Sequence, residues 1–106
     1  MSKFSLQDLE KIIASRADVT DGSSWTAKLV SGGVEKASKK FGEEAFETVI
    51  AALKETDTDL IGESADLLYH LLVVLHVRGV KIDAVLDELA RRTQQSGIVE
   101  KASRPQ

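Results

Sequence analysis

Helical periodicity runs through nearly all of the 106 residues, and this feature most limits what the chain can fold into. Apolar residues recur at the spacing of an α-helix, and we find no convincing alternating pattern of a strand. The single proline, Pro105, lies at the extreme tail, where it interrupts no helix. We therefore predict an all-α protein, a small bundle of four to five helices.

Capping and stop signals divide the chain into helices. Ser5 is the expected cap of the first helix, Gly79 the expected end of the third, and Asp83 the expected cap of the last. The expected helices are Leu6–Arg16, a short turn at Ser24–Leu29 after a Val19–Ser23 loop, Val34–Glu55, a helix from the Thr56-Asp57-Thr58 link to Arg78, and one carrying Val85, Leu86 and Leu89.

The length suits one domain, residues 1–106, with its core at about residues 4–92. The polar tail, residues 93–106, lacks a sustained apolar period from Gln94 onward and is expected to be irregular or conditionally ordered. By contrast, Leu67–Leu75 is apolar on nearly all sides of its helix. One thin bundle cannot cover such a helix, so we expect a homodimer.

Composition excludes several classes of function. The absence of cysteine removes disulfides, thiolate metal sites and cysteine nucleophiles, and it suits a reducing cytoplasm. A net charge of -3 argues against non-specific binding of nucleic acid. Met1–Ser5 contains no apolar segment of signal-peptide length, and Leu67–Val77 is too short to span a bilayer. We expect a cytoplasmic protein without a nucleic-acid or membrane partner.

Two acidic pairs are the strongest chemical signal: Glu44 with Glu47, and Glu63 with Asp66. Residues three apart on a helix share one face, so each pair presents its oxygens in one direction. Hard cations prefer oxygen ligands, and Mg²⁺ is usually held by a few carboxylates together with substrate phosphates. The pairs therefore predict a magnesium site that acts on a phosphorylated molecule.

Structural explanations compete with this prediction. Lys40 lies four residues before Glu44, so the second helix can be an ordinary solvated face with weak ion pairs. Glu63 and Asp66 are harder to explain in this way, because they lie at the entrance to a largely buried helix. The alternative for them is a buried salt bridge to Lys28, Lys36 or Lys40.

His70 lies four residues after Asp66 on the same side of its helix. It is expected either to hydrogen-bond to that carboxylate or to touch a substrate, with a satisfied core histidine as the alternative. A di-iron site is disfavoured, because Ile50 and not histidine lies three residues after Glu47. The chain also lacks a P-loop, a nucleophile elbow and a His-Glu-x-x-His motif.

Longer blocks carry a resemblance to a known family. They are Ser24-Trp25-Thr26-Ala27-Lys28-Leu29, Lys39-Lys40-Phe41-Gly42-Glu43-Glu44-Ala45-Phe46-Glu47 and Glu63-Ser64-Ala65-Asp66-Leu67-Leu68-Tyr69-His70-Leu71-Leu72. Together they resemble the phosphoribosyl-ATP pyrophosphohydrolases of the MazG-like all-α superfamily, over about Phe4–Arg92. One departure is Trp25, where relatives often carry tyrosine, so an indole N–H replaces the phenolic hydroxyl.

The resemblance implies Mg²⁺-dependent hydrolysis of 1-(5-phosphoribosyl)-ATP to 1-(5-phosphoribosyl)-AMP and pyrophosphate, the second step of histidine biosynthesis. The matching metal positions are Glu44, Glu47, Glu63 and Asp66, with Glu43 as an additional acid. Glu44 or Glu47 is the expected acid that orients or deprotonates water. Expected substrate contacts are Trp25, Lys28, Lys36 and Lys40, although each lysine is equally explained as a solvated side chain.

The sequence is also compatible with two other functions. One is a house-cleaning pyrophosphohydrolase of non-standard nucleoside triphosphates, which has the same metal motif. The other is a non-catalytic helical dimerisation module, whose acidic residues are only surface charge.

Overall fold

The computed structural model describes residues 3–105, and these residues form helices and connecting loops without strands. Met1 and Ser2, the start of the Met1–Ser5 segment considered above, lie outside the described residues, as does Gln106. The helices are α1 (Leu6–Ala17), α2 (Trp25–Ser31), α3 (Gly33–Lys54), α4 (Asp57–Arg78), α5 (Ile82–Arg92) and α6 (Gly97–Ala102). The all-α prediction is confirmed, with a sixth helix that was not expected.

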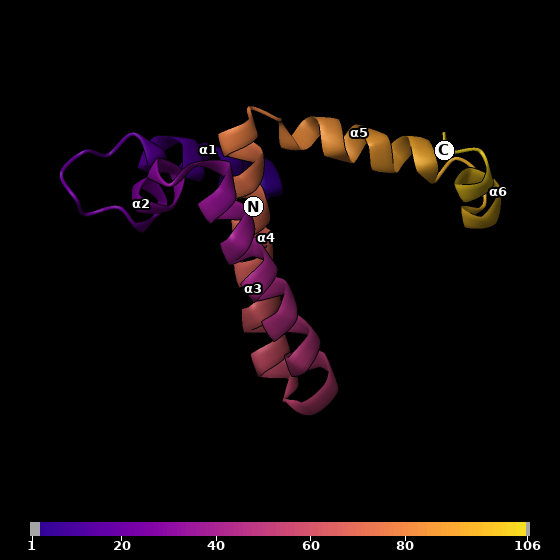
Figure 1. The fold of residues 1–106 in the computed structure, drawn as a ribbon. Helices are drawn as coiled ribbons and strands as arrows, with labels where there is room; N and C mark the ends of the chain where they lie inside the picture. The colour runs from indigo at the N-terminus through magenta and orange to yellow at the C-terminus, as the bar shows by residue number, and fades with distance from the viewer. Residues whose placement is uncertain (1–2, 106) are drawn as a thin grey trace.

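The long helices α3 and α4 lie side by side and form the stem of the molecule (Figure 1). α1 and α2 pack across one end of this stem, and α5 leads away from the same end as an arm that finishes in α6 (Figure 1). The core lies where α1 and α2 meet the stem. Its buried side chains are Ile13, Leu29, Ala37, Leu72, Val73 and Ile82.

Local signals set most helix ends. The Ser5 hydroxyl accepts the Asp8 N–H at 3.0 Å, and the Ser5 N–H donates to the Asp8 carboxylate at 3.0 Å, which forms a capping box. Thr56 and Asp59 form the same arrangement at the start of α4. α4 ends at Gly79, which adopts the left-handed conformation at φ 69°. The predicted cap at Ser5 and stop at Gly79 are confirmed.

The prediction that Asp83 caps the last helix is wrong. α5 begins one residue earlier, at Ile82, and Lys81 occupies the cap position without a side-chain hydrogen bond. The Ile82 N–H instead donates to a carboxylate oxygen of Glu10 in α1 at 2.7 Å. A residue distant in sequence therefore satisfies a free N–H group at the start of α5. A local sequence pattern cannot reveal such a contact.

The tail contains a helix, α6, which agrees with the expectation of conditional order and not with a wholly irregular tail. Ser96 caps α6 by accepting the Val99 N–H at 3.2 Å. The Glu100 side chain is only 3% exposed and pairs with Arg104 at 2.6 Å and with Arg91 of α5 at 3.6 Å. These charge-assisted contacts compensate for the weak apolar period and hold α6 against α5.

By length and composition alone, α4 meets the criteria for a membrane-spanning helix, with a mean hydropathy of 1.4. This differs from the expectation that its apolar stretch is too short, because the whole helix has 22 residues. The core helix of a soluble protein meets the same criteria but is mostly buried, whereas 17% of this stretch of α4 is buried within the single chain. In this fold α4 packs along α3 and carries Glu63 and Asp66 near its centre.

The conformation of Gly79 leads to a stability prediction. Gly79→Ala forces a Cβ into the left-handed region and is expected to lower the free energy of unfolding by about 1 kcal/mol. Gly62→Ala is the matched control, because Gly62 lies within α4 and a Cβ there meets nothing within 4 Å. It is expected to raise stability by about 0.5–1 kcal/mol. Urea unfolding followed by circular dichroism measures the free energy of unfolding of both variants. Equal changes in the two variants would show that the left-handed conformation of Gly79 does not determine the effect.

Candidate active site

Pairing of α3 with α4 brings the two acidic pairs together on the stem. Glu44 of α3 and Glu63 and Asp66 of α4 each offer a carboxylate oxygen, and these oxygens lie within 4.8 Å of one another. Glu44 and Glu63 are half-buried, whereas Asp66 is exposed. We call these three residues the carboxylate cluster. Such proximity leaves room for a cation that several oxygens contact at once.

A hydroxyl fixes the register of the two helices beside this cluster. Thr48 Oγ lies 2.8 Å from the carbonyl oxygen of Glu44, one turn back in α3, and 3.2 Å from the carbonyl oxygen of Glu63 in α4. This shared hydrogen bond joins the backbones of two acidic residues from different helices. Thr48 was not predicted as a positioning residue, since nothing in the sequence indicates its partner in α4.

Glu47 lies next to Glu63 but outside the carboxylate cluster. A hydrogen bond between the Glu47 and Glu63 side chains, followed by burial and by the negative charge of Glu47, raises the pKa of Glu63 above 4.5. Glu47 itself is exposed and lines a hollow of about 270 Å³ with Ile50, Glu55 and Glu63. Its carboxylate therefore has access both to solvent and to the cluster.

The fold destabilises the charged form of the Glu44 side chain. Burial, followed by repulsion from Glu47, raises the pKa of Glu44 above 4.5. Its Oε2 atom is buried and has no hydrogen-bond partner among the described residues. A buried acceptor without a donor is costly. A divalent cation would satisfy this oxygen and offset the repulsion, so the donor set fits Mg²⁺.

His70 is 6% exposed and lies beside the cluster in α4. Its Nδ1 atom hydrogen-bonds to the backbone carbonyl of Asp66 at 2.8 Å, and not to the Asp66 carboxylate as one prediction had it. Its Nε2 atom is buried without a partner among the described residues. A backbone carbonyl can only accept a hydrogen bond, so the Nδ1–H group is the donor in this contact.

The predicted lysines lie in two places. Lys40 pairs with Glu43 at 3.1 Å, and the hydrogen bond and charge of Glu43, followed by the charges of Glu44 and Glu47, raise the pKa of Lys40. Lys36 instead donates to the carbonyl oxygen of Lys28 at 3.3 Å, at the junction of α2 and α3. Within residues 3–105, no lysine pairs with a member of the carboxylate cluster, so the buried salt bridge considered above does not form.

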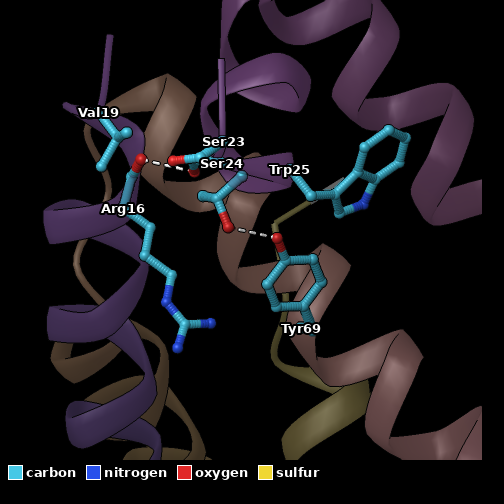
Figure 2. A pocket seen from close by; sticks show the side chains of 7 residues that line it. Arg16, Val19, Ser23, Ser24, Trp25 and Tyr69 are labelled. Carbon is cyan, nitrogen blue, oxygen red and sulfur yellow. Dashed lines mark hydrogen bonds between the residues drawn. The ribbon is translucent and has the colours of Figure 1, made fainter. Parts of the chain in front are cut away.

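Trp25 lies away from the carboxylates, at the start of α2, and is 55% exposed. Together with Tyr69 it lines a cavity of about 510 Å³ between the end of α1, the start of α2 and α4 (Figure 2). The Tyr69 hydroxyl lies 2.5 Å from the Thr26 hydroxyl, which gives it a polar partner. Arg16 and Ser23 also line this cavity, although no pattern in the sequence pointed to them.

Known proteins provide an independent comparison. A model of the family described as phosphoribosyl-ATP pyrophosphohydrolase matches residues 6–93. The chain belongs to the phosphoribosyl-ATP pyrophosphohydrolase family. The resemblance drawn from the three sequence blocks is therefore confirmed.

Curated members named phosphoribosyl-ATP pyrophosphatase are similar over nearly their whole length. The protein of Sinorhizobium medicae is 58% identical over 104 residues, which cover 98% of this chain and 97% of the relative. That of Rhizobium meliloti is 60% identical with the same coverage. That of Allorhizobium ampelinum is 60% identical over 98% of this chain and 100% of the relative. This family assignment favours a phosphoribosyl-ATP enzyme over a house-cleaning enzyme or a non-catalytic module.

The raised pKa values give a pH-dependent prediction. Glu44 and Glu63 keep their protons to higher pH in the fold than in the unfolded chain, whose carboxyls titrate near 4.5. Without metal, their contribution to stability is therefore lost as pH rises through the raised values. Glu63→Gln removes one of the repelling charges, so it is expected to raise the melting temperature at neutral pH by a few degrees. Circular dichroism melts in a chelating buffer measure this change.

Added Mg²⁺ provides the second half of that experiment. It is expected to raise the melting temperature of the natural sequence and to have little effect on Glu63→Gln. Glu35→Gln is the matched control, because Glu35 is an exposed glutamate in the first turn of the same α3 helix, and it should keep the full response. An unchanged Mg²⁺ response in Glu63→Gln would remove this residue from the metal site.

Proposed function

We propose that this chain hydrolyses 1-(5-phosphoribosyl)-ATP to 1-(5-phosphoribosyl)-AMP and pyrophosphate, the second step of histidine biosynthesis, in the cytoplasm. Membership of the phosphoribosyl-ATP pyrophosphohydrolase family supports the substrate and the reaction. The observation that carries the chemistry is the carboxylate cluster, whose three oxygens lie within 4.8 Å of one another around a buried acceptor without a donor.

In this proposal Glu44, Glu63 and Asp66 hold Mg²⁺, with Glu47 beside them. When bound by these carboxylates, Mg²⁺ would offset the charge of the triphosphate and lower the pKa of the attacking water. An all-oxygen donor set of carboxylates is the kind that Mg²⁺ prefers, with positions left for substrate phosphates. The cluster without a cation is strongly negative, so its residues alone would repel a polyanion.

Glu47 is the better candidate for the acid that orients the attacking water and accepts its proton. Glu44 and Glu63 belong to the cluster, whereas Glu47 lies outside it, is exposed and hydrogen-bonds to Glu63. A carboxylate that is adjacent to the metal ligands but free of the metal can act as a general base. His70 supports the site by fixing the Asp66 backbone through Nδ1.

Lys40 is the proposed phosphate contact closest to the cluster. It pairs with Glu43 and experiences the charges of Glu44 and Glu47, so a short movement of its flexible side chain brings the ammonium group to a bound phosphate. That charge stabilises the negative charge that develops on the leaving pyrophosphate. Lys28 and Lys36 are proposed as outer contacts, since they lie at the α2–α3 junction.

Activity tests this assignment. Purified protein with phosphoribosyl-ATP and Mg²⁺ is expected to release pyrophosphate, and Glu47→Gln should lower kcat by about 100-fold or more, because the amide cannot accept a proton. Glu55→Gln is a close control, since Glu55 lines the same hollow without belonging to the proposed machinery. Full activity in Glu47→Gln, with helicity intact, would exclude Glu47 as the base. A faster rate with deoxynucleoside triphosphates would favour the house-cleaning alternative.

We also propose that two copies associate, since the single chain is too open to be stable alone. Its radius of gyration is 16.0 Å, whereas a compact domain of this length has about 13 Å. Its accessible surface is 7737 Å², against about 5,800 Å² for a compact monomer of 11.5 kDa. Much apolar surface is exposed along the stem and the arm: Phe46, Val49, Leu53, Ile61, Leu68, Leu89, Ile98 and Val99.

Leu53→Glu tests the association. Leu53 is 77% exposed in the single chain. Burying an unpaired charge at an apolar interface is costly, so the variant should be largely monomeric at micromolar concentration. Light scattering after size exclusion should give about twice 11.5 kDa for the natural sequence. The control Ser15→Glu adds the same charge to an exposed residue of α1 and should stay dimeric. A monomer for the natural sequence would refute the proposal.

A further inference from the structure

The cavity beside Trp25 is well formed and has no role in the chemistry described so far. Its volume of about 510 Å³ lies in the usual range for sites of small molecules. Two aromatic rings, Trp25 and Tyr69, line it together with the cationic side chain of Arg16 (Figure 2). None of these groups belongs to the carboxylate cluster.

Hydrogen bonds fix the walls of this cavity. The Ser24 hydroxyl donates to the backbone carbonyl of Arg16 at 2.7 Å and accepts the Ala27 N–H at 3.0 Å, which ties the end of α1 to the start of α2 (Figure 2). The Thr26 and Tyr69 hydroxyls, 2.5 Å apart, tie α2 to α4. Ser24 is 9% exposed and Thr26 only 3%. The Ser24, Thr26 and Tyr69 hydroxyls that shape the cavity are therefore already paired.

Arg16 is the group in this cavity that is left to bind a ligand. Figure 2 shows its guanidinium group in the space between α1 and the Tyr69 ring. Although the chain has 17 acidic residues, Arg16 forms no salt bridge within residues 3–105. A guanidinium group presents a planar fork of donors that matches phosphate oxygens. The cavity thus combines one phosphate-binding group with two aromatic walls.

The cavity begins one helical turn from the carboxylate cluster. Tyr69 lies three residues after Asp66 in α4, so the two side chains lie on neighbouring parts of one helix face. One elongated ligand can therefore reach from the cluster into the cavity. The proposed substrate has this form, because its triphosphate and the phosphate of its phosphoribosyl group lie at opposite ends of the nucleoside.

We infer that Arg16 binds the phosphate of the phosphoribosyl group, while Trp25 and Tyr69 contact the rings between the two phosphate ends. This inference rests on the proposed function and makes Arg16 a specificity residue. Ordinary nucleoside triphosphates lack this second phosphate, so they gain nothing from Arg16. The triphosphate remains at the carboxylate cluster and Lys40.

The test compares phosphoribosyl-AMP, which keeps the phosphoribosyl phosphate, with pyrophosphate, which lacks it. Arg16→Gln is expected to raise KM for phosphoribosyl-ATP by about 10- to 100-fold, from the loss of charge-assisted hydrogen bonds, with kcat within about twofold. Calorimetric affinity for phosphoribosyl-AMP, which keeps the phosphoribosyl phosphate, should fall by the same factor. Inhibition by pyrophosphate should not change. Arg16→Lys should recover part of the affinity, because it restores the charge without the fork.

Arg78→Gln is the matched control, since Arg78 is an exposed arginine at the end of α4 outside this cavity, and it should behave as the natural sequence. An unchanged KM and phosphoribosyl-AMP affinity in Arg16→Gln would overturn the inference. Weaker pyrophosphate inhibition with unchanged phosphoribosyl-AMP binding would also overturn it, by assigning Arg16 to the triphosphate. Binding of phosphoribosyl-AMP does not require catalysis. The binding measurement therefore tests the role of Arg16 even if the chain does not hydrolyse phosphoribosyl-ATP.

Discussion

The structure depends on the close pairing of α3 with α4, which forces carboxylates from both helices together. Glu44 faces Glu63 and Asp66 across this pairing, and Thr48 locks the register by contacting backbone carbonyls of both helices. Like charges at such distances destabilise the fold unless a proton or a cation intervenes. Burial, followed by the charge of Glu47, raises the pKa of Glu44, and the Glu47 side chain, followed by burial, raises that of Glu63. A cation at the proposed site would offset the negative charge of these carboxylates. The same crowding of carboxylates that destabilises the fold would therefore favour binding of a cation in the proposed site.

Much of this arrangement could be predicted from the sequence, because its causes are local. Ser5 and Gly79 set helix ends through contacts within one turn, and the acidic pairs share a helix face by spacing alone. The two acidic pairs also predicted a cluster of carboxylates, because few other acidic residues interrupt the apolar sequence of α4. Glu47 was grouped with the metal ligands on the same spacing, whereas the three oxygens that meet within 4.8 Å belong to Glu44, Glu63 and Asp66.

Features that depend on distant contacts were missed or mistaken. The start of α5 is satisfied by Glu10 from α1, so the local signal at Asp83 was misleading. α6 is held by Glu100, whose partners include Arg91 of the preceding helix, so the composition of the tail gave no sign of it. Arg16 gains its significance only because Ser24 and Thr26 fold α2 against α1 and α4. Tertiary packing, and not local pattern, creates that cavity.

Exposed apolar side chains lie on the same stem as the carboxylate cluster. The stem that carries the carboxylate cluster also exposes apolar side chains such as Phe46 and Leu53, so the surface proposed to associate lies along the same two helices as the proposed site. A second copy that covers this surface would restrict access of water to the half-buried carboxylates. Lower dielectric around the cluster would then strengthen its interaction with a cation.

We propose that Mg²⁺ binding to the carboxylate cluster displaces protons from Glu44 and Glu63, whose pKa values are raised. Calorimetric titration of Mg²⁺ at about pH 5, in two buffers with different ionisation enthalpies, tests it directly, because binding to protonated carboxyls must release protons. We expect saturable binding whose apparent heat differs between the two buffers, because each buffer takes up the released protons with its own ionisation enthalpy. Binding with identical heats in both buffers, or no binding at all, would contradict it.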